Sequence, residues 1–160
     1  MKESINNALI LNIVIIFLFV MAILFAGSTA YTKAFKVKNK IINILERNES
    51  SLVGKTQFPS EITSEIDQAL SDIGYRIEKN VDQKCKNAMN KRFKNSRYDA
   101  TPIITGTNYN FCVTRFHDDS DVMQGEYYAV ITYMYFEIPL LGKTLEFPVY
   151  GETKTLGLKY

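Results

Sequence analysis

The sequence predicts an α+β protein in which a long N-terminal helix is followed by a short helix packed on an antiparallel β-sheet of three to five strands. Three observations predict this fold. Residues Ala8–Gly27 form an apolar run that is interrupted only by Asn12. Apolar side chains then recur at helical spacing as far as Leu45. The C-terminal half is rich in tyrosine, valine and isoleucine, which favour strands.

The apolar run is long enough to form a transmembrane helix. Its twenty residues, at about 1.5 Å each, span roughly 30 Å, which is the thickness of the hydrocarbon core of a bilayer. No charged residue lies between Glu3 and Lys33. A cleavable signal peptide is the alternative, with Ser28-Thr29-Ala30 as the cleavage site, but the apolar region of such peptides is usually only about 7–15 residues long. We therefore predict a membrane anchor.

The helical pattern continues beyond the anchor without proline or glycine, and a signal peptide would not need this continuation. The residues at helical spacing are Tyr31, Ala34, Phe35, Lys38, Ile41, Ile42 and Leu45. We expect one helix from about Ser4 to Arg47. Residues 1–48 are thus a transmembrane helix with its amphipathic continuation, residues 49–58 a linker, and residues 59–160 one small α+β domain.

The small domain begins with a second helix, predicted from Ser60 as N-cap to Gly74 as C-cap. The apolar stripe of this helix consists of Ile62, Ile66, Leu70 and Ile73. Strands are predicted at residues 74–78, 108–116, 126–138 and 144–156. The last two form a hairpin, and Pro148 places the returning strand at an edge of the sheet or at a bulge.

Two cysteines, Cys85 and Cys112, lie outside the apolar run. An even number of cysteines in an exported domain predicts a disulfide. Closing a loop of 27 residues stabilises a fold by about 3–4 kcal/mol in the chain-entropy model. The spacing of the two cysteines does not match a zinc site.

The segment 84–97 carries six basic residues and no acidic one, although the net charge of the whole chain is only +2. These residues are Lys84, Lys86, Lys91, Arg92, Lys94 and Arg97. Such a segment can bind a DNA backbone, an anionic cell-envelope polymer or lipid headgroups. The simpler interpretation, which we favour, is a solvated loop whose charges balance acidic neighbours.

The sequence contains no recognisable motif for catalysis or for binding a cofactor. His117 is the only histidine, and no nucleophile or phosphate-binding motif accompanies it. The acidic stretch Asp118–Asp121 does not match the spacing of a calcium loop and favours a solvated turn. Carboxylate chemistry by Glu126 and Glu137 stays open. We predict that the chain is not an enzyme and that it needs no cofactor or metal.

Several residues are candidates for contacts with other molecules. Asn12 either hydrogen-bonds to a neighbouring membrane helix or is a tolerated residue near the end of the span. Gly27 marks either a helix-packing position or a flexible point. Tyr127, Tyr133 and Tyr135 share one face of their strand and form either a surface for a partner or part of the core.

The layout resembles the type IV pilin superfamily, and more specifically the TadE-like small membrane proteins and pseudopilins of pilus and secretion systems. The resemblance is carried by the short polar leader MKESINN, by Glu3 ahead of the apolar run and by the amphipathic continuation through Phe35 and Ile42. It is also carried by the closing sheet with FPVYGETKT at Phe147–Thr155. No glycine ends the leader, so an unprocessed minor component fits better than a major pilin.

This resemblance implies a non-enzymatic structural or assembly component of a bacterial surface pilus or secretion apparatus. Its partners would be membrane lipid and other pilin-like or TadE-like subunits in an oligomeric assembly. The alternative is a membrane-tethered binding module for DNA or an anionic cell-envelope polymer, which would use the basic segment 84–97.

The orientation of the chain in the membrane is predicted by two conflicting signals. The lysines that follow the anchor, Lys33, Lys36, Lys38 and Lys40, favour a cytoplasmic C-terminal domain by the positive-inside rule. The cysteine pair favours the opposite side of the membrane. Because the resemblance agrees with the cysteines, we expect a single-pass protein whose C-terminal domain is extracytoplasmic.

Overall fold

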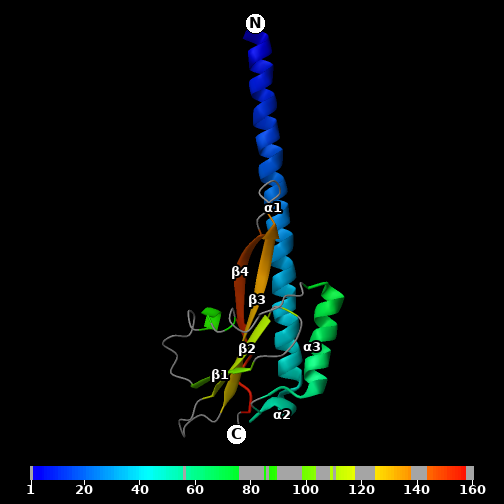
Figure 1. Cartoon of the computed structure of the whole chain (residues 1–160), viewed down its shortest axis with the longest axis vertical. Coiled ribbons are helices and arrows are strands. Elements are labelled where there is room, and N and C mark those ends of the chain that lie inside the picture. Colours follow the sequence, from blue (N-terminus) through cyan, green and yellow to red (C-terminus); the bar gives the residue numbers. More distant parts are fainter. Residues whose placement is uncertain are drawn as a thin grey trace.

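A computed structural model of the protein describes residues 2–55, 57–75, 85, 87–89, 99–103, 109, 111–117, 125–137 and 144–157. The described helices are α1 (Lys2–Arg47), α2 (Glu49–Leu52) and α3 (Ser60–Ile73). The described strands are β1 (Asp99–Ile103), β2 (Phe111–His117), β3 (Glu126–Glu137) and β4 (Thr144–Glu152). Figure 1 shows that the N-terminal half of α1 projects from the rest of the described chain, while its C-terminal half lies along the sheet. The predicted α+β layout is confirmed.

The four strands form one antiparallel sheet in the order β1-β2-β3-β4, so β4 is an edge strand, which is one of the two alternatives that Pro148 predicts. The pairing of β2 with β3 reaches Thr132, and Tyr133 is the next residue of β3. At Tyr133 the Tyr75 hydroxyl makes the backbone hydrogen bonds that a neighbouring strand would otherwise make. It accepts a hydrogen bond from the Tyr133 N–H (2.7 Å) and donates one to the Tyr133 carbonyl (3.0 Å). Pro148 lies opposite Tyr133 in β4. Since these Tyr133 groups point away from β4, the missing N–H of Pro148 faces the open edge and removes no bond from the ladder.

The C-terminal half of α1 lies directly on one face of the sheet. Its buried residues are Ala34, Val37, Ile41, Ile44 and Leu45. The Thr132 hydroxyl of β3 donates a hydrogen bond of 3.1 Å to the Ala34 carbonyl, at a buried point of this contact. Gly151 of β4 allows a similarly close approach, because a Cβ built there would lie 2.7 Å from Lys38 Cδ.

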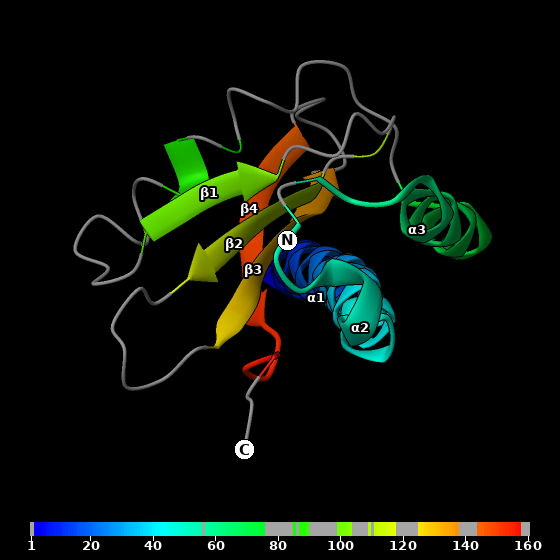
Figure 2. The same cartoon turned by 90° about the horizontal axis from the view of Figure 1, so that it is seen from below.

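The short helix α3 packs chiefly against α1, on the side away from the sheet (Figure 2). Its predicted stripe is buried at Ile62, Ile66 and Leu70. Arg47 of α1 and Glu65 of α3 form an exposed ion pair. The sequence predicts that the short helix rests on the sheet, and in this detail it differs from the structure, because the longer amphipathic helix takes that position.

The second face of the sheet is covered by a separate apolar cluster. Cys85 and Met89 lie against Cys112, Phe116 and residues of β3. Cys85 and Cys112 are placed at disulfide distance, with their Cα atoms 5.5 Å apart, which agrees with the predicted disulfide. The disulfide therefore fastens this covering segment to β2.

Several local predictions need correction. Part of the expected linker is helical, since Glu49–Leu52 form α2 and Leu52 is buried. Ser60 is the first residue of α3 rather than its N-cap, because the Pro59 carbonyl already accepts the first helical hydrogen bonds. Gly74 is the C-cap, as predicted, with φ 66° in the left-handed region. Residues 76–78 of the expected strand 74–78 lie outside the described residues, and Tyr75 is not in a strand.

Candidate functional site

The exposed half of α1 is the main candidate for contacts outside the chain. Its large apolar side chains are exposed on all sides of the helix, from 36% at Phe19 and Met21 to 69% at Phe25. Among the described residues, one helix, described as Ala8–Arg47, is long and apolar enough to cross a membrane. Soluble proteins rarely expose contiguous apolar surface of this extent, so the exposed half is the candidate for contacts with lipid or with other helices.

The two predicted helix-packing residues have different surroundings. Asn12 lies within the exposed half of α1, where its side chain is available to lipid or to another helix. Gly27 lies where α1 meets the sheet. A Cβ built there would contact the Phe136 ring of β3 at 3.6 Å, which is an ordinary van der Waals distance. One neighbour of Gly27 is therefore within the same chain, and its close approach does not require glycine.

The three tyrosines were expected to form either a surface for a partner or part of the core, and their burial favours the core. Tyr133 is 5% exposed and is a core residue. Tyr127 is half-buried and stacks on Phe116, with the ring centroids 4.9 Å apart. Tyr135 is half-buried and packs against both apolar clusters. Cys85 and Met89 cover this face of the sheet.

Most of the other candidate residues belong to two charged segments of the chain. All six basic residues of the segment 84–97, namely Lys84, Lys86, Lys91, Arg92, Lys94 and Arg97, lie outside the described residues. The acidic stretch Asp118–Asp121 also lies outside the described residues, and His117 is the last residue of β2. Within the described ranges, no group of three or more His, Cys, Asp or Glu side chains is placed to hold a metal ion.

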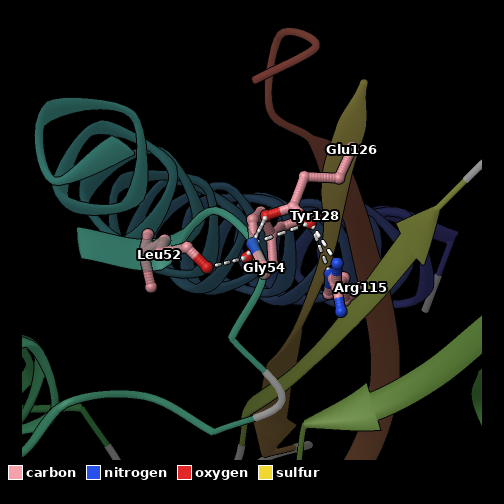
Figure 3. Close-up of polar contacts among 5 residues, drawn as sticks. All are labelled: Leu52, Gly54, Arg115, Glu126 and Tyr128. Atoms are coloured by element: carbon pink, nitrogen blue, oxygen red, sulfur yellow. Dashed lines mark hydrogen bonds and ion pairs between the residues drawn. The ribbon is translucent and has the colours of Figure 1, made fainter. Parts of the chain in front are cut away.

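A buried polar cluster around Glu126 is a feature that the sequence does not reveal (Figure 3). The Glu126 side chain is 3% exposed and lies 2.5 Å from both Nε and Nη2 of Arg115, through its Oε2 atom. Its Oε1 atom accepts hydrogen bonds from the Tyr128 hydroxyl (2.9 Å) and from the Gly54 N–H (3.2 Å). The Tyr128 oxygen also lies 3.1 Å from the Leu52 carbonyl. The cluster thus joins β2 and β3 to the turn that follows α2.

The protonation state of Tyr128 fits this arrangement. Burial raises the pKa of the Tyr128 hydroxyl above its ordinary value, and the Glu126 charge and its hydrogen bond raise it further. The hydroxyl therefore stays protonated at neutral pH and acts as a donor. Because the Arg115 and Glu126 charges are paired and the Tyr128 hydroxyl and Gly54 N–H each have an acceptor, the cluster is organised for stability of this end of the domain.

The C-terminal residues are attached at the same end of the domain. Glu126 and Leu156 exchange two backbone hydrogen bonds, of 3.0 and 2.7 Å. The Gly157 N–H donates to Glu49 Oε1 at 2.8 Å. The cluster and these contacts hold α2, β3 and the C-terminal segment together at the end opposite the exposed half of α1 (Figure 1).

Comparisons of this chain with family models, with curated proteins and with solved structures gave no match. The fold and the site define a class by their geometry alone: a small α+β domain built around the C-terminal half of a helix whose N-terminal half is apolar and exposed. The resemblance to TadE-like and pilin-like proteins stays a prediction.

Proposed function

We propose that the chain is a single-pass, membrane-anchored and non-enzymatic subunit of a bacterial surface pilus or secretion apparatus, of the TadE-like or pilin-like kind. The exposed half of α1 anchors the subunit and contacts the helices of other subunits in the membrane. The domain lies outside the cytoplasm and forms the part of the subunit that projects from the membrane.

The observation that carries this proposal is the continuity of α1. One helix supplies both the apolar segment and the centre of the domain core, where Val37, Ile41 and Leu45 are 0% exposed. A helix shared in this way couples the position of the domain to that of the anchor, because no flexible linker separates them. Such coupling suits a structural subunit, whereas a tethered binding module works equally well on a flexible linker.

The cysteine pair supports an extracytoplasmic domain. Disulfides persist in oxidising compartments and are rare in the cytoplasm. Cys85 and Cys112 are 5% and 3% exposed, and they join the segment that covers the second face of the sheet to strand β2. The lysines after the anchor remain the opposing signal, so the orientation needs a direct test.

Photocrosslinking in membranes tests the assembly part of the proposal. A photoreactive phenylalanine analogue replaces Phe19, in the exposed half of α1, in the full chain expressed in cells. We expect adducts with a second copy or with another membrane subunit, and we expect Asn12→Leu to lower their yield if Asn12 bonds to a neighbouring helix. The same analogue at Val53, which is 40% exposed at the other end of the domain, is the control.

Two outcomes would contradict the proposal. Extraction of the chain from membranes by alkaline carbonate would show that α1 does not span the bilayer. The second outcome is that the Phe19 probe forms adducts with lipid alone, at native expression levels and in cells that assemble the apparatus. This result would show that the chain is anchored but has no helix partners in the membrane.

A further inference from the structure

The domain has exposed apolar side chains beside the anchor. Tyr31 and Phe35 of α1 are 53% and 41% exposed, and Leu145 and Phe147 of β4 are 40% and 46% exposed. We call these four residues the juxtamembrane cluster. Outside the exposed half of α1, Val53 is the remaining large apolar residue with comparable exposure among the described residues.

The four side chains belong to one side of the domain. Gly151 of β4 faces Lys38 and Ile42, so Phe147 and Leu145, at even spacing from Gly151, share the face of β4 that is turned toward α1. Tyr31 and Phe35 precede Lys38 and Ile42 on the same stripe of α1, at helical spacing. The Tyr31 and Phe35 rings stack with centroids 6.1 Å apart, and Lys38 Nζ lies 4.1 Å from the Phe35 ring centroid.

The contact between Gly27 and Phe136 fixes the height of the cluster relative to the anchor. Phe136 pairs with Leu145, so Leu145 lies level with the end of the apolar run. Tyr31 is four residues beyond Gly27, or about 6 Å along the helix. Phe147 is two residues beyond Leu145, or about 7 Å along the strand. The headgroup region of a bilayer extends about 5–8 Å beyond each side of the hydrocarbon core.

These heights place Leu145, Tyr31 and Phe147 in the headgroup region whenever Ala8–Gly27 fills the hydrocarbon core. Phe35 is eight residues beyond Gly27, or about 12 Å along the helix, so it lies at the outer boundary of this layer, where its ring stacks on that of Tyr31. Aromatic side chains are enriched at this depth, because their rings tolerate the boundary between apolar and polar surroundings. Exposed Lys33 and Lys36 lie on the same turns of α1 and suit anionic headgroups. A second copy docked through the same face would bring two Lys38 ammonium groups together, because Lys38 Nζ lies over the Phe35 ring, and this is unfavourable.

We propose that Leu145, Tyr31 and Phe147 of the juxtamembrane cluster are immersed in the headgroup layer of the membrane that holds α1, with Phe35 at its outer boundary, and that anionic phospholipid is the ligand of the cluster. The inference rests on the proposed anchor. It adds that the domain is docked on the bilayer surface with the β3–β4 end of the sheet in contact with lipid, instead of standing clear of the membrane on a bare helix. The first residues of β4, at the open edge of the sheet, would then contact lipid.

Tryptophan fluorescence can test this docking cleanly, because the chain contains no tryptophan. The full chain with Phe147→Trp is reconstituted in vesicles of an equal mixture of phosphatidylcholine and phosphatidylglycerol. Phosphatidylcholine brominated near the headgroup or near the chain ends then serves as quencher. Val53→Trp, at the other end of the domain, is the matched control, and Phe19→Trp reports on the anchor.

We expect Phe147→Trp to emit at shorter wavelength than Val53→Trp and to lose most of its fluorescence to lipid brominated near the headgroup. Leu145→Trp should behave in the same way, which keeps the test valid if one variant does not fold. If Phe147→Trp and Leu145→Trp are no more quenched than Val53→Trp, the inference is wrong. Shielding from aqueous iodide without quenching by lipid, increasing with the ratio of protein to lipid, would show a second copy on this face and would also overturn it.

Phe19→Trp separates the failure of this inference from the failure of the proposed function. Quenching of Phe19→Trp by lipid brominated near the chain ends, with no quenching of the two cluster variants, rejects the docking and keeps the anchor. If Phe19→Trp also escapes quenching, the membrane anchor itself is wrong, and the inference fails with it.

Discussion

Replacing Glu126 with leucine perturbs the buried cluster that joins β2 and β3 to the turn after α2. The side chains of Glu126 and Arg115 are 3% and 13% exposed, so the substitution leaves a guanidinium group largely buried without its carboxylate. Removal of one partner of a buried ion pair typically costs about 3–5 kcal/mol. The Tyr128 hydroxyl and the Gly54 N–H lose an acceptor as well, so we expect a loss in the upper part of this range.

A double variant distinguishes the cost of a stranded charge from the value of the pair. In Glu126→Leu/Arg115→Met both charges are removed, and apolar replacement of a whole buried pair is often nearly neutral. We therefore expect the double variant to be more stable than Glu126→Leu alone, by about 1–3 kcal/mol. Glu152→Leu, at an exposed position of β4, is the matched control and should change stability by no more than about 0.5 kcal/mol.

The measurement is urea unfolding of the full chain in a mild detergent, followed by the near-ultraviolet circular dichroism of its tyrosines. This signal reports on the domain core, because α1 can stay helical in detergent after the domain unfolds. A loss below about 1 kcal/mol for Glu126→Leu would refute the reasoning. A double variant that is less stable than Glu126→Leu would also refute the reasoning, because it would show that the buried Arg115 side chain stabilises the fold without the Glu126 carboxylate.

Three further predictions concern other residues. Tyr75→Phe removes the hydroxyl that bonds both backbone groups of Tyr133, and it should lower the free energy of unfolding by about 1–3 kcal/mol; an unchanged urea midpoint would contradict this. Burial raises the pKa of Asp67 above 3.8, so the folded state binds the proton more tightly than the unfolded chain and stability falls as pH rises through this range. Asp67→Asn should therefore stabilise the domain at pH 7 but not below pH 3.8, and a gain independent of pH would exclude this cause. Gly27→Ala should raise stability by about 0.5–1 kcal/mol, because its methyl group fits against Phe136 and alanine favours the helix; a loss would show that glycine is needed there.

The elements with strong periodicity could be predicted from the sequence. The apolar run and its amphipathic continuation predict α1 to within a few residues at each end. The strand-forming segments predict β2, β3 and β4, and Pro148 predicts the edge position of β4. The disulfide follows from the even number of cysteines, since the chain offers only one intramolecular pairing.

Contacts between elements could not be predicted in the same way. Periodicity shows that a helix has an apolar face, but it does not show which element meets that face. Two amphipathic helices compete for the sheet here, and α1 takes it because Gly151 and Ala34 let the backbones approach closely. The covering of Tyr133 by the segment around Cys85 also depends on a long-range contact, and only the cysteine pair hints at it.

The Glu126 cluster could not be predicted from the sequence either. Its members come from the turn after α2 and from two strands, and no short motif joins them. One signal was present: Glu126 and Arg115 are charged residues within segments that otherwise consist mostly of strand-forming residues. A charge in such a segment needs a partner of opposite sign, which is a reason to look for one.

The oxidation state of the cysteines in membranes tests the central claim, that an anchored chain carries an extracytoplasmic domain, most directly. Membranes from intact cells are washed with alkaline carbonate and denatured, and a maleimide mass tag is added with or without prior reduction. Denaturation is needed because Cys85 and Cys112 are buried. We predict that the chain stays in the membrane pellet and accepts the tag at both cysteines only after reduction. Tagging of both cysteines without reduction would place the domain in the cytoplasm, in agreement with the lysines after the anchor, and would contradict the account.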